Sequence, residues 1–172
     1  SRAVAVLFDV TGSMHTVPRL LVSKLDKLMA SLVKKGLLAH PHVLFGAIGD
    51  ATTDKVPLQV GQFEGGNEMD EALTNIVLEG NGGGQNTESY ELAMYFMARH
   101  TDIHCFTKRG QKGYLFLTGD ERPYPKVKRS EVQRIIGEDI GEDIPVEAIL
   151  AELREKYEVF WLMPGGTNHW GD

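Results

Sequence analysis

The amino-acid sequence predicts a three-layer α/β fold, a doubly wound and mostly parallel sheet with one antiparallel edge strand. Short apolar runs of strand length alternate with longer segments that have helical spacing. Strands that alternate with helices indicate right-handed crossovers, which place helices on both faces of a parallel sheet. With 172 residues, 42% of them hydrophobic, the chain can form one full core, so we expect a single domain over residues 1–172.

The first half of the chain predicts three strands and a long helix. Residues 3–9 (AVAVLFD) form a buried strand, and residues 18–35 have leucines at helical spacing, with Pro18 suited to the first turn. Residues 43–48 (VLFGAI) predict a second buried strand. Residues 57–63 alternate in polarity like an edge strand, so we expect a hairpin-like pair with the preceding strand.

The second half predicts the remaining layers. Helices are expected over residues 67–78, 88–99 and 145–156, with a short one after Ser130, and strands over residues 114–118 and 159–163. Tyr90 falls on the face of its helix that we expect to pack on the sheet. The glycine run 82–84 breaks the chain before that helix, and Asp50 and Asp54 are expected in a solvated loop.

Composition excludes several functional classes. The net charge of −6, from 24 acids against 18 Lys and Arg, offers no basic surface for nucleic acid. Cys105 is the only cysteine, so an internal disulfide is impossible. The single cysteine favours a cytoplasmic location. No apolar run reaches the roughly 20 residues that cross a bilayer, so we expect no membrane insertion. A strand at the very start and an abrupt end fit a domain taken from a longer chain.

Oxygen-bearing side chains follow the first strand. If the backbone stays extended, Asp9, Thr11 and Ser13 point the same way and converge on one point. Asp120 follows a later strand, and the carboxyl ends of parallel strands share one edge where ligands bind. Carboxylates and hydroxyls of this kind form either a site for a hard divalent cation or a nucleophile site.

The stretch VLFDVTGSM, residues 6–14, resembles the first motif of the von Willebrand factor type A domain family, which opens its metal-ion-dependent adhesion site. The turn GGGQNTESYELA resembles the second motif, where the ligand position falls on Gln85 or on the nearest hydroxyl, Thr87. The third motif appears as LTGDE, with its acid displaced by one residue to Asp120.

The resemblance implies a Rossmann-like fold of bacterial type whose final helix is missing from this chain. It also implies a divalent cation, Mg²⁺ in the first place with Ca²⁺ or Mn²⁺ as alternatives, and no catalysis. The implied ligands are Asp9, Thr11, Ser13, Gln85 or Thr87, and Asp120. The cation would accept an Asp or Glu from a partner protein or domain, which makes the chain a protein-protein interaction module.

The same residues also resemble the haloacid dehalogenase-like phosphotransferases, which carry an Asp-x-Thr-Gly-Thr motif after one strand and Thr-Gly-Asp after another. On that interpretation Asp9 is a nucleophile that attacks phosphate beside Mg²⁺. The expected Gly-Asp-Gly-x-x-Asn-Asp stretch is absent from the sequence, and Thr11 stands where most of these phosphatases have their general acid. The adhesion-type site is therefore the preferred prediction.

Overall fold

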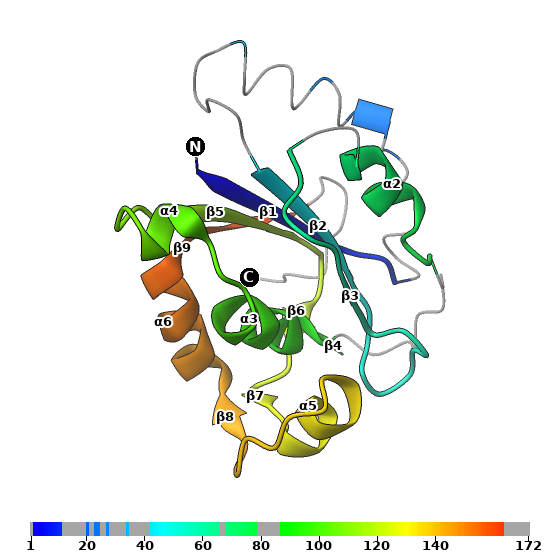
Figure 1. Ribbon diagram of the computed structural model, residues 1–172. Helices are drawn as coiled ribbons and strands as arrows, with labels where there is room; N and C mark the ends of the chain where they lie inside the picture. Colours follow the sequence, from blue (N-terminus) through cyan, green and yellow to red (C-terminus); the bar gives the residue numbers. More distant parts are fainter. Residues whose placement is uncertain are drawn as a thin grey trace.

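The main element of the structure is a five-stranded mixed sheet (Figure 1). The computed structural model describes residues 2–11, 42–65, 68–78 and 87–163, together with positions 20, 23, 24, 27 and 34. The strand order is β3-β2-β1-β5-β9, in which β3 alone is antiparallel to its neighbour. These strands are β1 (Ala3–Asp9), β2 (His42–Ile48), β3 (Leu58–Val60), β5 (Gly113–Thr118) and β9 (Tyr157–Leu162).

Five helices and two small sheets complete the described part of the chain. The helices are α2 (Glu68–Thr74), α3 (Tyr90–Arg99), α4 (His104–Thr107), α5 (Arg129–Ile135) and α6 (Val146–Lys156). One two-stranded sheet pairs β4 (Thr87–Glu88) with β6 (Arg122–Pro123), and the other pairs β7 (Lys126–Val127) with β8 (Ile144–Pro145).

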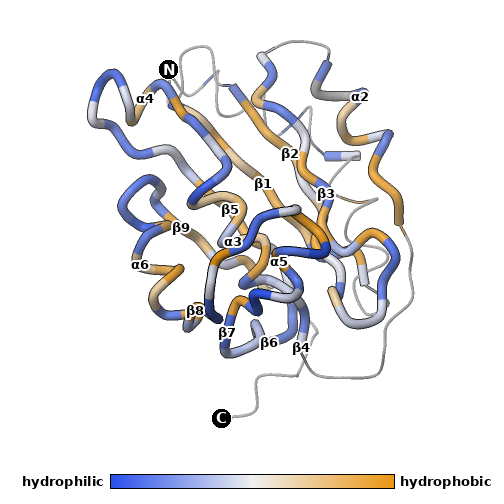
Figure 2. The backbone as a smooth tube through the Cα atoms, turned by 60° about the horizontal axis from the view of Figure 1, so that its bottom comes forward, coloured by the Kyte–Doolittle hydropathy of each residue, from blue (hydrophilic) through white to orange (hydrophobic). Residues whose placement is uncertain are grey.

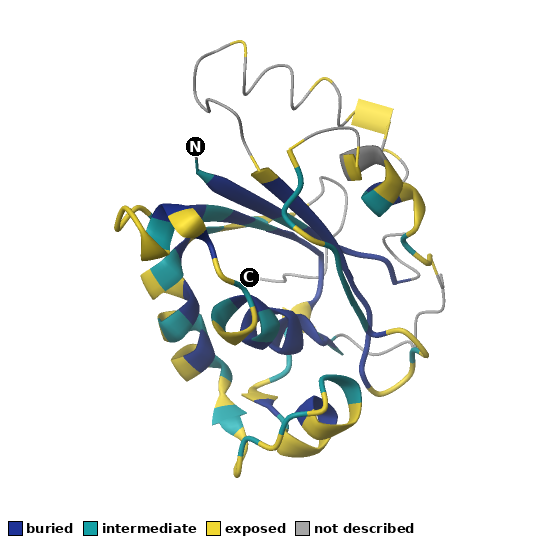
Figure 3. Cartoon of the chain, viewed as in Figure 1, coloured by how far each residue is buried: buried dark blue, intermediate teal, exposed yellow. Residues whose placement is uncertain are grey.

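The core lies between the sheet and the helices α3 and α6 (Figure 3). The central strand β1 is buried along nearly its whole length, as expected for a strand with parallel neighbours on both sides. In Figure 2 the hydrophobic residues gather on the central strands, while the loops around them are largely hydrophilic. A second apolar cluster lies on the opposite face of the sheet and includes Phe8, Phe45 and Leu73 of α2.

The predicted three-layer, doubly wound, Rossmann-like architecture is wrong. In the described residues the segments around the five-stranded sheet form two-stranded sheets and mostly short helices rather than two full helical layers. Residues 122–123, 126–127 and 144–145, which carry no strand periodicity, form paired strands instead of staying in loops. The helix expected over residues 18–35 lies outside the described residues except for isolated positions.

We expect Leu117→Ala to destabilise the fold strongly. Leu117 lies in β5 with 0% exposure, so truncation leaves a cavity between the sheet and its helices. The expected loss in free energy of unfolding is about 2–5 kcal/mol, measured by urea denaturation. Leu162→Ala, at a position on β9 that is 47% exposed, is the control and should lose much less. Equal losses in the two variants would contradict this assignment of the core.

Candidate functional site

Asp9 and Thr11 form a closed turn at the carboxyl end of β1. The Oδ1 atom of Asp9 accepts hydrogen bonds from the backbone N–H of Thr11 at 2.8 Å and from its hydroxyl at 2.5 Å. Both side chains are buried, with exposures of 0% and 2%. Asp is suited to such a turn because its short side chain reaches the backbone two residues further on. The turn fixes a carboxylate and a hydroxyl side by side.

Tyr90, the first residue of α3, holds the other oxygen of Asp9. Its hydroxyl donates a hydrogen bond to Oδ2 of Asp9, and its ring is fully buried. Trp161 of β9 packs edge-on against this ring with centroids 4.8 Å apart, and its indole N–H donates to the carbonyl of Gly119 at 3.1 Å. Three distant parts of the sequence therefore fix the Asp9 carboxylate.

Asp120 lies close to Asp9 because β1 and β5 are parallel neighbours. The pairing of Phe8 with Thr118 brings the ends of both strands to one edge of the sheet. Asp120 is 1% exposed. Burial raises the pKa of Asp9 first, and the negative charge of Asp120 raises it further, while hydrogen bonds from Thr11 and Tyr90 act in the opposite direction. The carboxyl groups of Asp9 and Asp120 are thus both buried and close enough for the charge of Asp120 to act on Asp9.

The segment around Thr87 reaches the same edge through the small sheet β4-β6. Thr87 pairs with Arg122, two residues after Asp120, and Glu88 pairs with Pro123. Glu88 is 4% exposed. Burial, together with the negative charges of Asp9 and Asp50, raises the pKa of Glu88 to about 9. A hydrogen bond with the Thr11 side chain acts in the opposite direction and lowers this pKa. Sequence reasoning missed Glu88, although an acid directly after the candidate ligand Thr87 was a visible signal.

The structure therefore brings four of the six predicted ligand positions to one edge of the sheet. Asp9, Thr11 and Asp120 are buried there, and Thr87 arrives with β4. Ser13 and Gln85 lie outside the described residues.

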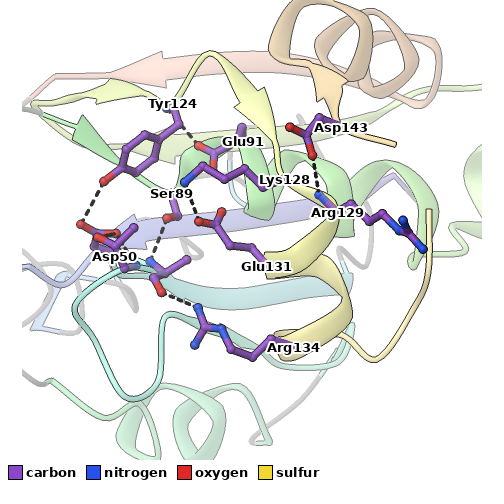
Figure 4. Close-up of polar contacts among 11 residues, drawn as sticks. Asp50, Ser89, Glu91, Tyr124, Lys128, Arg129, Glu131, Arg134 and Asp143 are labelled. Atoms are coloured by element: carbon purple, nitrogen blue, oxygen red, sulfur yellow. Dashed lines mark hydrogen bonds and ion pairs between the residues drawn. The ribbon is translucent and has the colours of Figure 1, made fainter. Parts of the chain in front are cut away.

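Asp50, which was predicted to lie in a solvated loop, is instead 1% exposed and central to a polar network (Figure 4). Its Oδ1 accepts hydrogen bonds from the backbone and hydroxyl of Thr52 at 2.7 and 2.8 Å, and its Oδ2 accepts one from the Tyr124 hydroxyl at 3.2 Å. The adjacent Ala51 bonds Ser89 through its N–H and Arg134 of α5 through its carbonyl. This loop joins the start of α3 to α5.

A second pair of buried acids adjoins this network, to which Tyr124 connects Glu91. Glu91 accepts a hydrogen bond from the backbone N–H of Tyr124 at 3.1 Å, and Glu131 accepts one from the Lys128 ammonium at 2.7 Å (Figure 4). Within the described part of the chain, Oε1 of Glu91 and Oε2 of Glu131 have no hydrogen-bond partner. Burial raises the pKa of Glu91 to about 8, and the charge of Glu131 adds to the rise.

The oxygen atoms at this edge of the sheet are of the chemical type that a hard cation takes as ligands. Carboxylate and hydroxyl oxygens are the ligands that Mg²⁺ and Ca²⁺ take, and crowded buried carboxylates gain from a positive charge between them. Among the described residues no three His, Cys, Asp or Glu side chains are grouped closely enough to hold an ion by themselves. A cation here would therefore depend on hydroxyls and water as well as on Asp9 and Asp120.

The fold and this edge together define a mixed α/β domain with a buried, acidic, oxygen-rich site at the carboxyl ends of β1 and β5. No protein-family model and no curated protein matches the chain. No helix in the described residues has the length and apolar character needed to cross a bilayer.

Solved structures share the fold at low sequence identity. The pilus adhesin SpaC from Lactobacillus rhamnosus GG matches with a TM-score of 0.58 and 11% identity, over 98% of this chain and 25% of that protein. The proximal thread matrix protein 1 of the mussel byssus matches with a TM-score of 0.52 and 11% identity, over 96% of this chain and 38% of that protein. The chain thus spans well under half of each, and neither is described as an enzyme.

Proposed function

We propose that the chain is a cation-dependent protein-binding module rather than an enzyme. The observation that carries the proposal is the pairing of buried Asp9 and Asp120 beside the Thr11 hydroxyl at one sheet edge. A divalent cation held by these groups, with Ser13 and Gln85 or Thr87 completing the set, would supply a Lewis-acidic position for an outside carboxylate. The partner is then a protein or domain that presents an Asp or Glu. Mg²⁺ is the first choice of cation, with Ca²⁺ or Mn²⁺ as alternatives.

The resemblance of VLFDVTGSM to the adhesion-site motif supports this function. Adhesion, the role named for SpaC, belongs to the same broad class, although the similarity to that protein is one of fold.

The sequence also favours binding over phosphoryl transfer, because the Gly-Asp-Gly-x-x-Asn-Asp stretch of the phosphotransferases is absent and Thr11 stands where most of them have their general acid. In this structure Asp9 is 0% exposed, both of its oxygens accept hydrogen bonds, and burial raises its pKa. A cation ligand must be ionised, so a bound cation would have to supply the charge that keeps Asp9 ionised in this buried position.

We expect Asp9→Ala to abolish Mg²⁺ binding and leave a folded domain. The apolar faces of β1 are unchanged, and loss of one of several crowded acids relieves charge repulsion. Asp9→Asn, whose single side-chain oxygen can still accept from Thr11 but whose NH₂ group cannot accept from Tyr90, should bind at least tenfold more weakly than the parent. The measurement is a calorimetric Mg²⁺ titration of chelator-stripped protein, with circular dichroism to check folding.

The control variant is Asp139→Asn, because Asp139 is an exposed acid paired with Arg129 on the surface. It should bind Mg²⁺ like the parent. The same samples are assayed for hydrolysis of p-nitrophenyl phosphate. Full Mg²⁺ affinity in Asp9→Ala would contradict the site, and phosphate release that depends on Asp9 would identify a phosphotransferase instead.

A further inference from the structure

The α5 segment, defined here as residues 124–135, meets α3 through two buried glutamates. Glu91 of α3 is 0% exposed and Glu131 of α5 is 7% exposed. One oxygen of Glu91 accepts a hydrogen bond from the Tyr124 backbone N–H, and one oxygen of Glu131 accepts a hydrogen bond from the Lys128 ammonium. In the part of the chain that the structure describes, the other two oxygens, Oε1 of Glu91 and Oε2 of Glu131, are buried without a hydrogen-bond partner.

A single ammonium group lies beside these two acids (Figure 4). Lys128 donates to Oε1 of Glu131 at 2.7 Å and lies 4.9 Å from the centre of the Tyr124 ring. If both glutamates were ionised, two negative charges would stand against one positive charge, and an uncompensated buried charge is costly. A proton on Glu91 restores the balance. Burial raises the pKa of Glu91 to about 8, and the charge of Glu131 adds to the rise, while backbone N–H groups and Lys128 oppose it.

The remaining charged groups around this contact are engaged elsewhere or exposed. Arg134 of α5 bonds the carbonyl of Ala51, and Asp50 accepts a hydrogen bond from the Tyr124 hydroxyl. From the other elements that pack on α3, Arg122 of β6 and Lys126 of β7 are exposed, and Glu152 of α6 pairs with Arg99.

We propose that Glu91 and Glu131 form a pH-sensitive contact that holds the α5 segment on α3 and loosens it as pH rises. With the proton on Glu91, one buried negative charge stands beside one ammonium. Without it, the second charge gains water only when the α5 segment opens, which also exposes the buried Val127 and Val132. Opening frees the carbonyl of Ala51 as well, in the loop that carries Asp50. The inference does not depend on a cation at the sheet edge.

The test is amide hydrogen exchange measured by mass spectrometry from pH 5 to pH 9, corrected for the pH dependence of intrinsic exchange. In the open segment Glu91 has its ordinary pKa of 4.5, so opening releases a proton between this pH and about pH 8. The protection factor of the α5 segment should therefore fall by about tenfold per pH unit up to about pH 8 and level off above it.

Three variants assign the effect to the two glutamates. Glu91→Gln should remove the pH dependence and keep the α5 segment protected at pH 9. Glu131→Gln removes the neighbouring negative charge, so the decrease should level off at a lower pH than in the parent. The control Glu142→Gln, at an exposed position between α5 and β8, should follow the parent. Circular dichroism verifies that each variant is folded, and Glu131→Gln tests the contact if Glu91→Gln does not fold.

The protection of α6 provides an internal reference. The amides of α6 should be better protected than those of the α5 segment at each pH, because the α5 segment opens while the rest of the domain stays folded. Equal protection factors in both at every pH would mean that the segment opens only when the whole domain unfolds, and the proposal fails. It also fails if the parent shows no pH dependence in the α5 segment, or if Glu91→Gln keeps the parental slope.

Discussion

Gly119→Ala is expected to destabilise the protein and to disturb the site directly. A Cβ atom at this position would lie 2.1 Å from the Tyr90 hydroxyl oxygen, 2.5 Å from Cζ and 2.7 Å from Cε1, well inside van der Waals contact. The Tyr90 ring cannot easily move away, because Trp161 packs against it and its hydroxyl bonds Asp9. The expected cost is at or above the roughly 1–3 kcal/mol typical of an overpacked core.

The test is a double-mutant cycle with Tyr90→Ala, followed by urea denaturation. In the Tyr90→Ala background the obstructing ring is gone, so Gly119→Ala should cost far less than in the parent. Mg²⁺ affinity should also fall in Gly119→Ala, since a displaced Tyr90 no longer fixes Asp9. If Gly119→Ala lowers the free energy of unfolding equally in the parent and in the Tyr90→Ala variant, the contact with the Tyr90 ring is not the reason that glycine is needed at this position.

The elements that local patterns predicted are the ones with strong periodic signals. The strand predicted over residues 3–9 is observed as β1 (Ala3–Asp9), and the helix predicted over residues 145–156 as α6 (Val146–Lys156). In such segments the apolar spacing and the element length are both encoded within a few neighbouring residues. The local pattern of apolar residues is therefore sufficient to predict these elements.

Local sequence patterns could not predict the overall architecture. The strands β4, β6, β7 and β8 have two residues each, and each exists only because a segment far along the chain pairs with it. Two residues carry no periodicity, so a sequence pattern treats them as loop. The doubly wound prediction followed from assigning such segments to simple connections between helices and strands.

The site was predictable where it depends on strand ends. Asp9 and Asp120 were expected together because they follow parallel strands, and the structure places them at one edge. The hydroxyl of Tyr90 on Asp9 was not predictable, because helical spacing indicates only that Tyr90 faces the core. The burial of Asp50 likewise depends on the distant residues Ser89, Tyr124 and Arg134.

Glu91→Gln is expected to make the protein more stable at alkaline pH. The pKa of Glu91 is raised from 4.5 to about 8 in the folded protein, chiefly by burial. Between these two pH values the folded state keeps a proton that the unfolded state has lost, so the folded state is progressively disfavoured as pH rises. Above pH 8 a buried negative charge remains beside Glu131, and its cost is fully expressed.

Glutamine removes this charge but keeps a side-chain oxygen that can accept the hydrogen bond from the Tyr124 N–H. The two proteins should therefore have similar free energies of unfolding near pH 4, and the variant should be more stable by a few kcal/mol near pH 9. Urea denaturation between these limits measures the difference. Glu142→Gln, at an exposed acidic position, should stay within about 0.5 kcal/mol of the parent. Parallel stability curves for Glu91→Gln and the parent would mean that the Glu91 carboxyl group ionises freely in the fold, through water or an unrecognised counter-charge.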